Sequence, residues 1–282
     1  EHYIGGAWVA SRDGREHVVI DPSTEEGAVT IVLAGPQDVD AAVAAAKAAL
    51  PGWSATPPAE RRALVERILA QYRRREEDFA RAISREMGAP IDFARAEQAP
   101  SFSWHAEGFL KAFEAIEWIR PLGASGRGSM IAMEPIGVAA LITPWNWPAN
   151  QIALKVVPAL LAGCTMVLKP SEQAPLSACV VAEMIHDAGC PAGVFNMVQG
   201  DGAGAGARLS AHPDIDMVSF TGSTRAGRAI TVAAADTFKR VTLELGGKGA
   251  NLVFADADGA AVERGVRRVM ENTGQSCNAP SR

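Results

Sequence analysis

The sequence predicts an α/β fold built around a doubly wound, mainly parallel sheet. Between residues 137 and 245, short apolar segments alternate with helical ones. Strands this short and this apolar are typical of parallel sheets that helices cover on both faces. The strands are expected at 137–143, 165–169, 195–198, 217–220 and 240–245. The connecting helices are expected at 150–161, 175–188, up to about 212 and 224–234.

The part of the chain before this alternation is predicted to be mostly helical. One helix is expected over 37–50, ending at Pro51-Gly52, and a longer one over 58–87, which Gly88 stops. A third helical segment is expected over much of 94–117. The longer helix is supported by apolar residues at helical spacing, namely Leu64, Ile68, Tyr72, Phe79, Ile83 and Met87.

A β-ribbon is predicted where the composition changes, over residues 119–134. Gly123, Gly126 and Gly128 lie there between two strand-like flanks. A further helix is expected to begin near Gly259.

Composition excludes several classes of protein. With 48% hydrophobic and 21% charged residues and a net charge of −5, the 282-residue chain resembles a soluble globular protein. Charges of both signs are interspersed, and no apolar run reaches the length of a membrane span, so neither nucleic acid nor membrane is an expected partner. Residues 1–6 look like the start of a fold and not like a secretory leader, which favours a cytoplasmic protein.

The cysteine and histidine positions favour reduced thiols and no metal site. The cysteines show no CxxC spacing and the histidines are dispersed along the chain. The cysteines are Cys164, Cys179, Cys190 and Cys277.

Ligands of doubly wound sheets bind at the carboxyl ends of the strands, and unusual residues follow several of the predicted strands. Asn146 lies between two tryptophans and two prolines in 144–148, where it is either a rigid amide donor for an oxyanion or a buried cap of the next helix. Lys169 and Glu172 follow another strand. They are either ligands of a ribose or adenosine phosphate or an ordinary surface pair.

Two further strand ends carry glycines. Gly222 and Ser223 form a strand–turn–helix junction whose amides and hydroxyl suit a pyrophosphate, although a plain turn explains the pattern equally well. Glu244 is followed by Leu245-Gly246-Gly247, where the small residues leave room for a flat ring beside a candidate base. A tight turn with an exposed glutamate is the alternative.

Cys277 is the candidate nucleophile. It lies among the polar residues Gln275, Ser276 and Asn278. These neighbours disfavour the alternative that Cys277 is a small apolar side chain buried in the core. A thiolate attacks carbonyl carbons readily, and a carboxylate such as Glu244 can later activate water.

Taken in order, these motifs resemble the non-acylating branch of the NAD(P)-dependent aldehyde dehydrogenase superfamily, over essentially the whole chain. The matching motifs are Pro-Trp-Asn-Trp-Pro at 144–148, Lys-Pro-Ser-Glu at 169–172, Phe-Thr-Gly-Ser-Thr at 220–224, Glu-Leu-Gly-Gly-Lys at 244–248 and Gly-Gln-Ser-Cys at 274–277.

The resemblance implies a role for each matched residue. Cys277 is the nucleophile, Asn146 and the backbone N–H of Cys277 form the oxyanion hole, and Glu244 is the general base. Lys155 matches a lysine with a supporting role near the active site. Cofactor binding is implied for Trp145, Lys169, Glu172, Gly222, Ser223, Leu245 and Gly246.

The implied reaction oxidises an aldehyde to a carboxylic acid through a cysteine thiohemiacetal and a thioester. NAD is the expected cofactor, because the carboxylate of Glu172 near the ribose 2′ position repels a 2′-phosphate; NADP is not excluded. A CoA-acylating relative is the alternative enzyme, which Glu244 disfavours because acyl transfer to a thiol needs no such base.

The implied Rossmann-type, aldehyde dehydrogenase-like fold has three parts. Residues 1–117 and 136–245 form the nucleotide-binding domain, 118–135 a β-ribbon oligomerisation arm, and 246–282 the start of a second α/β catalytic domain. A homodimer or homotetramer is expected. Because members of the family continue well beyond the nucleophile, the chain is expected to be a fragment or a natural truncation. The third functional alternative is therefore a catalytically impaired nucleotide-binding protein.

Overall fold

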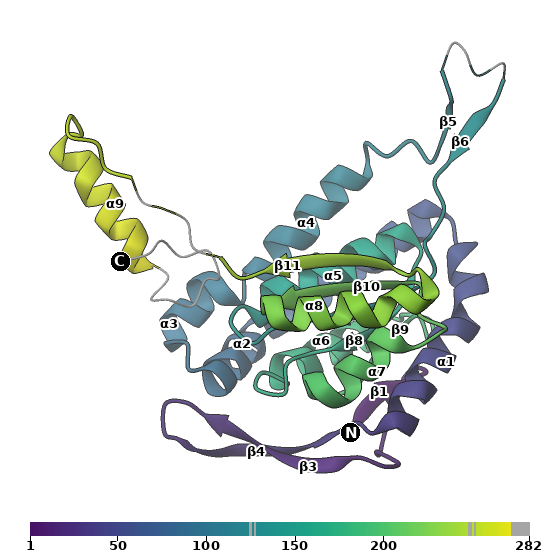
Figure 1. Ribbon diagram of the computed structural model, residues 1–282, viewed down its shortest axis with the longest axis horizontal. Helices are drawn as coiled ribbons and strands as arrows, with labels where there is room; N and C mark the ends of the chain where they lie inside the picture. Colours follow the sequence, from purple (N-terminus) through teal and green to yellow (C-terminus); the bar gives the residue numbers. More distant parts are fainter. Residues whose placement is uncertain (124–125, 127, 248–249, 251, 272–282) are drawn as a thin grey trace.

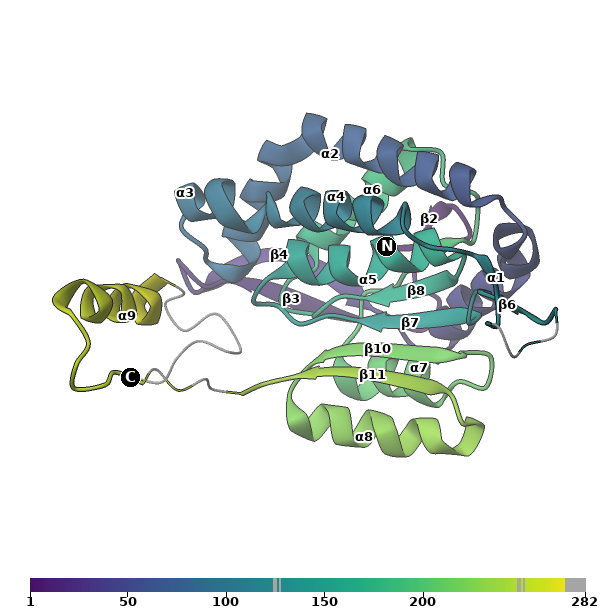
Figure 2. The same cartoon turned by 90° about the horizontal axis from the view of Figure 1, so that it is seen from above.

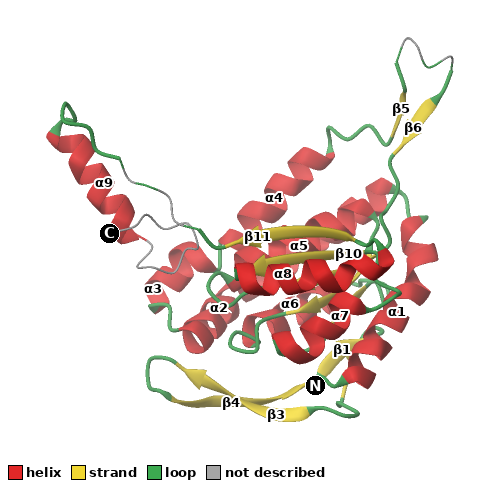
Figure 3. Ribbon diagram, in the orientation of Figure 1, coloured by secondary structure: helices red, strands yellow, loops and turns green. Residues whose placement is uncertain are grey.

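The structure is a computed structural model that describes residues 1–282 except 124–125, 127, 248–249, 251 and 272–282. Strands and helices alternate in its second half, as the sequence predicts (Figure 3). The strands are β1 His2–Ile4, β2 Ala7–Val9, β3 Arg15–Asp21, β4 Glu26–Leu33, β5 Ile119–Pro121, β6 Met130–Ala132, β7 Val138–Ile142, β8 Thr165–Lys169, β9 Phe195–Met197, β10 Met217–Gly222 and β11 Arg240–Leu245.

The helices match most of the predicted positions. They are α1 Pro36–Ser54, α2 Pro58–Met87, α3 Ile91–Phe93, α4 Ser101–Phe113, α5 Pro148–Ala162, α6 Leu176–Asp187, α7 Ala207–Ala211, α8 Thr224–Ala234 and α9 Gly259–Glu271. Short π-helical turns cover Ala94–Gln98 and Gly202–Gly206, and a 3-10 turn covers Ala235–Thr237.

The main sheet has seven strands in the order β11-β10-β7-β8-β9-β1-β2. The neighbours from β11 to β9 are parallel, whereas β1 is antiparallel to both β9 and β2. From β7 the chain winds first to β8 and β9 on one side and then to β10 and β11 on the other (Figure 1). The predicted doubly wound α/β fold is therefore confirmed.

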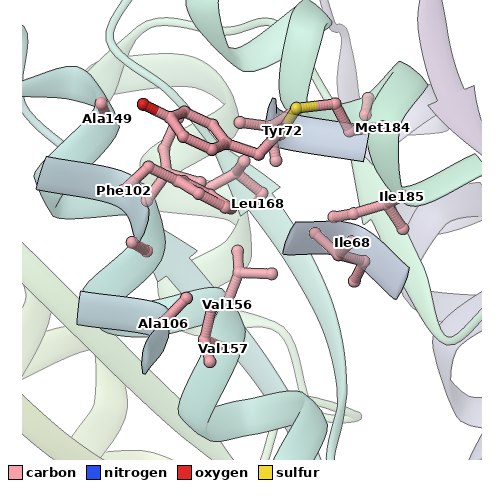
Figure 4. Close-up of a cluster of buried hydrophobic side chains, with 14 of the residues drawn as sticks. Ile68, Tyr72, Phe102, Ala106, Ala149, Val156, Val157, Leu168, Met184 and Ile185 are labelled. Carbon is pink, nitrogen blue, oxygen red and sulfur yellow. The ribbon is translucent and has the colours of Figure 1, made fainter. Parts of the chain in front are cut away.

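Helices cover both faces of this sheet, and Figure 2 shows the two layers. One core lies between the sheet and helices α2, α4, α5 and α6. It includes Tyr72 of α2, which stacks on Phe102 of α4 with ring centroids 5.5 Å apart (Figure 4). The second core lies between the opposite face and helices α1, α7 and α8. Burial on both faces explains why the central strand β7 is apolar throughout.

The sequence analysis missed the strands in the first 33 residues. The short strand β1 pairs with β9, where Tyr3 lies opposite Met197. Three-residue strands are too short to show an alternating pattern, and a partner this far along the chain leaves no local signal. In the β3–β4 hairpin, Val18, Val19 and Ile20 are apolar in succession, although Val18 and Ile20 are exposed and Val19 is buried.

Two helix ends also differ from the prediction. Helix α1 continues through Pro51 to Ser54, because the buried ring of Trp53 packs into the first core and offsets the hydrogen bond that proline cannot donate. Helix α4 ends at Phe113 and not near residue 117. The predicted stop at Gly88 is confirmed, since this residue takes the left-handed conformation (φ +73°).

The predicted ribbon is present as the antiparallel pair β5–β6, in which Ile119 lies opposite Ala132. It projects from the rest of the molecule (Figure 1). Among the described residues, none of the helices combines the length and apolar character needed to cross a bilayer.

Candidate active site

The residues singled out in the sequence follow parallel strands that end at one edge of the sheet. Ile142 of β7 is paired with Lys169 of β8 on one side and with Phe220 of β10 on the other. Gly222 at the end of β10 is paired with Leu245 of β11. The winding direction reverses between β7 and β10, which is where ligands bind in such sheets.

A cavity of about 520 Å³ lies at this edge. It brings together Asn146 from the loop after β7, Lys155 from α5 and Glu244 from β11. The other residues that line it are Trp147, Asn150, Gln151, Leu154, Ser219, Phe220, Thr221, Thr242 and Leu245. A neutral amide, a cation and a carboxylate therefore face a common space from three different elements.

Lys155 is the buried cation of this cavity. Its ammonium donates a hydrogen bond to the Ser219 hydroxyl at 3.0 Å. Burial lowers the pKa of Lys155 to about 8, although the nearby Glu244 carboxylate acts in the opposite direction. Glu244 lies on the exposed face of β11, which alternates with the buried face formed by Val241, Leu243 and Leu245.

Asn146 is held in place by the segment around it. Its backbone carbonyl accepts a hydrogen bond from the Gln98 side chain at 3.2 Å, and its side chain is buried. Helix α5 begins at Pro148, and its N-cap position is Trp147. Asn146 is therefore not the N-cap of the helix that follows, and it is one of the residues that line the cavity.

The Lys169–Glu172 segment lies outside the residues that line this cavity. Lys169 is buried, and its ammonium donates to the carbonyls of Pro170 at 2.6 Å and Gly200 at 2.7 Å. The half-buried carboxylate of Glu172 is 3.8 Å from the same nitrogen. Burial lowers the pKa of Lys169 to about 8. This is a positioned cation with an accessible acceptor beside it, and not a pair of mobile surface charges.

The Gly222–Ser223 junction begins helix α8. The Ser223 hydroxyl caps the helix by accepting the Ala226 N–H at 3.2 Å. A hydroxyl that accepts in this way can still donate its own proton to an anion. At Gly222, a Cβ atom would come within 2.5 Å of the Phe220 ring, so glycine permits the close turn.

The remaining predicted residues fall in different places. Trp145 is 44% exposed and does not line the cavity, whereas Leu245 does and also packs against the second core. Gly246 is exposed, and apart from its two chain neighbours none of the described residues has an atom within 4 Å of the position that a Cβ would take. Cys277 lies outside the described residues.

The sequence analysis did not single out Thr221, although it lines the cavity. Its hydroxyl is buried and, among the described residues, has no hydrogen-bond partner. Thr221 directly precedes Gly222 at a strand end, and that position was the available signal. Nor did the sequence single out Gln151 and Leu154, one helical turn apart on α5, because cavity lining by a helix depends on tertiary packing.

No three His, Cys, Asp or Glu side chains of the described residues are arranged to hold a metal ion.

Comparison with known proteins decides the family. Residues 8–282 match the profile of the aldehyde dehydrogenase family. The chain belongs to this family. An aldehyde dehydrogenase of Bartonella henselae superimposes on 99% of the chain with a TM-score of 0.97 and 53% sequence identity, and the match covers 59% of that protein.

Two further aldehyde dehydrogenases are informative. The 3-succinoylsemialdehyde-pyridine dehydrogenase of a Pseudomonas species is 51% identical over the whole chain and 59% of its own length. A variant of aldehyde dehydrogenase C from Pseudomonas syringae, solved with NAD+ and octanal, matches 99% of the chain and 57% of its own length, with 49% identity and a TM-score of 0.95. The chain thus spans less than two thirds of these aldehyde dehydrogenases.

Proposed function

We propose that the protein oxidises an aldehyde to a carboxylic acid with NAD+ as hydride acceptor. The observation that carries the proposal is the cavity at the carboxyl edge of the sheet, where Asn146, Lys155 and Glu244 face one space. Family membership and the NAD+ and octanal in the Pseudomonas syringae structure support the same reaction class.

The residues at the neighbouring strand ends fit the cofactor by their chemistry. The N-terminal amides of α8 and the Ser223 hydroxyl are suitable donors for a pyrophosphate. The Lys169 ammonium is a suitable donor to the hydroxyls of a ribose, and the Glu172 carboxylate is a suitable acceptor from them. Trp145, Gly222, Leu245 and Gly246 are proposed to complete the cleft, which is adjacent to the cavity. When bound, NAD+ supplies the electrophile that accepts the hydride.

The protein's own residues carry the remaining chemistry. The Cys277 thiolate adds to the aldehyde carbon, and the Asn146 amide with the Cys277 N–H stabilises the oxyanion that forms. Loss of hydride from this carbon leaves a thioester on Cys277. Glu244 then takes a proton from water, the water oxygen bonds to the acyl carbon, and the carboxylic acid leaves as the C–S bond breaks.

Lys155 is proposed to support Glu244 through its charge. It lines the same cavity and is protonated below about pH 8. A cation beside a carboxylate favours the ionised form, which is the form that can act as a base. The hydrogen bond to Ser219 fixes the position of that cation.

The domain organisation is part of the proposal. We assign 1–117 and 136–245 to nucleotide binding, 118–135 to an oligomerisation arm and 246–282 to the start of the catalytic domain. The exposed apolar side chains of Ile119 and Met130 on the ribbon support a contact between subunits of a homodimer or homotetramer.

The Glu244→Gln variant of the full-length protein tests the proposed reaction. It should release about one NADH per active site and then stall at the thioester, because water is no longer activated. The matched control is Thr242→Val, which alters the same face of β11 in the same cavity and should keep steady turnover. Steady turnover by Glu244→Gln at the wild-type rate would disprove the role of Glu244. Product formation only when CoA is added would favour the acylating alternative.

A further inference from the structure

A second cavity, of about 570 Å³, lies where the base of the β-ribbon meets the start of helix α2. Its walls are the α1–α2 connection around Ala55 and Pro57, the ribbon residues Trp118 and Met133, and the side chain of Arg61. None of the residues that line the cavity beside Glu244 contributes to this one. It is therefore a separate site.

Arg61 in this cavity is a buried cation that has no counter-ion among the described residues. Its side chain lies in the first turn of α2 and is only 3% exposed. Its Nε is buried and has no hydrogen-bond partner, and no carboxylate of the described residues influences its pKa. Arginine stays protonated in proteins, so the charge persists. A buried charge is costly unless a partner of opposite charge or a set of hydrogen bonds compensates for it.

The neighbouring Arg62 shows what an ordinary arginine does on the same helix. It is more exposed and forms ion pairs with Glu66 at 2.9 Å and Glu114 at 2.7 Å. Both arginines are near carboxylates in the sequence, yet within the described part of the chain Arg62 forms ion pairs and Arg61 does not. The absence of a partner for Arg61 within the described residues is thus a property of its position and not of the local composition.

The surroundings hold the Arg61 guanidinium in place. Its central carbon lies 4.8 Å from the centre of the Trp118 ring, which provides a cation–π contact on one side. On another side is Gly163, where a Cβ would come within 2.0 Å of the Arg61 Nη1. Glycine at 163 therefore leaves room for the guanidinium. A guanidinium held in this way can donate two parallel N–H hydrogen bonds to the two oxygens of a carboxylate.

The walls of the cavity indicate what else the ligand carries. Apart from Arg61 and Glu134, they consist mainly of apolar and proline side chains together with Ser54 and Thr56. Glu134 is exposed, so water and salt screen its charge more strongly than that of the buried Arg61. An organic carboxylate with an apolar body matches this combination better than inorganic phosphate, which offers nothing to the apolar walls.

We propose that the cavity between the base of the β-ribbon and helix α2 is a binding site for a small organic carboxylate, with Arg61 as the anion receptor and Trp118 as its support. The proposal concerns a site apart from the proposed aldehyde chemistry and does not depend on it.

Benzoate is a suitable probe, used with the purified protein and with inorganic phosphate as the comparison. Binding is followed by titration calorimetry and by tryptophan fluorescence, which should respond because Trp118 contacts the receptor. We expect millimolar benzoate binding that weakens at least tenfold in Arg61→Gln and is unchanged in Arg62→Gln. In Trp118→Phe the fluorescence change should disappear. Benzoate that binds instead in the cavity beside Glu244 would give a heat of binding, but its affinity would not fall in Arg61→Gln.

Glu134→Gln keeps the test decisive even where Arg61→Gln folds poorly. This exposed residue can be changed without disturbing the core, and removal of its negative charge should tighten benzoate binding several-fold. Unchanged affinity in either of these variants, measured on folded protein, or no binding to the wild-type protein, would overturn the site. Phosphate binding as tight as that of benzoate would overturn the requirement for an apolar body.

Discussion

Thr221 of β10 and Glu244 of β11 are direct partners in the parallel ladder, and both line the cavity at the carboxyl edge of the sheet. The next pair in register is Gly222 with Leu245. One residue along each strand thus separates the proposed base from the turn that begins the proposed cofactor site. This register explains how a single sheet edge can carry both the proposed base and the start of the proposed cofactor site.

The first prediction concerns the nucleophile. In the full-length protein, Cys277→Ser should abolish NADH formation while NAD binding persists, because Gly222 and Ser223 are unchanged. NADH formation is followed by absorbance and NAD binding by calorimetry. Near-normal turnover in Cys277→Ser would contradict the assignment.

The other cysteines are the matched controls for that experiment. Burial raises the pKa of Cys179 to about 11 and that of Cys190 to about 12, and it also raises the pKa of Cys164. Their thiols stay protonated at neutral pH and are poor nucleophiles. Serine variants at these three positions should keep most of the activity.

A second prediction concerns the oxyanion donor. Asn146→Asp preserves the shape of the side chain but replaces its N–H donor, so kcat should fall by roughly 10²–10³-fold with little change in KM. Steady-state kinetics measure both constants. Gln151→Met alters the same cavity without removing a proposed catalytic group and should have a much smaller effect on kcat. A loss of only a few-fold in Asn146→Asp would rule out a major role for this amide.

A third prediction separates two roles of Ser223. Ser223→Ala removes the cap of α8 and should lower the free energy of unfolding by about 1 kcal/mol, measured by urea denaturation. Ser223→Asn restores a capping side chain and should recover this stability. If the hydroxyl also binds the pyrophosphate, both variants should bind NAD more weakly. If NAD affinity falls in Ser223→Ala but recovers together with stability in Ser223→Asn, Ser223 acts only as a cap.

The fourth prediction concerns Glu86, which links helix α2 to helix α6. Its carboxylate is 3% exposed and accepts the backbone N–H groups of Leu176 at 2.5 Å and of Ser177 at 3.2 Å. Burial raises the pKa of Glu86 to about 7, although these hydrogen bonds oppose the change. Because the folded state binds the proton more tightly than the unfolded state, this contribution to stability is complete below about pH 4.5 and is lost as the pH rises through 7.

Glu86→Gln isolates that effect, since glutamine keeps an acceptor for the same N–H groups. Between pH 5 and pH 8, the wild-type protein should lose up to about 3 kcal/mol of unfolding free energy relative to Glu86→Gln. Urea denaturation at several pH values measures the difference. Glu76→Gln, at an exposed glutamate of the same helix, is the control for the substitution itself. Parallel curves for Glu86→Gln would show that its carboxyl is not perturbed.

The sequence determined the alternating part of the fold because each strand and helix there has a local signal. The mainly apolar run 165–169 coincides with β8, the alternating segment 240–245 coincides with the edge strand β11, and residues 224–234 coincide with α8. Parallel strands buried on both faces must be apolar throughout, and a helix that covers them must repeat its apolar residues every third or fourth position. The motifs at the strand ends predicted Asn146 and Glu244, which line the cavity, for the same reason, since parallel strands share one carboxyl edge.

Only the tertiary structure decided the features that depend on distant partners. The strand β1 exists through its pairing with β9, and helix α1 passes Pro51 because Trp53 is buried in the core. The charge environment of Lys155 and the lack of a counter-ion at Arg61 within the described residues likewise follow from what packs around them. A sequence specifies which groups are present, but the desolvation and the distances that set their free energies arise only when remote segments meet.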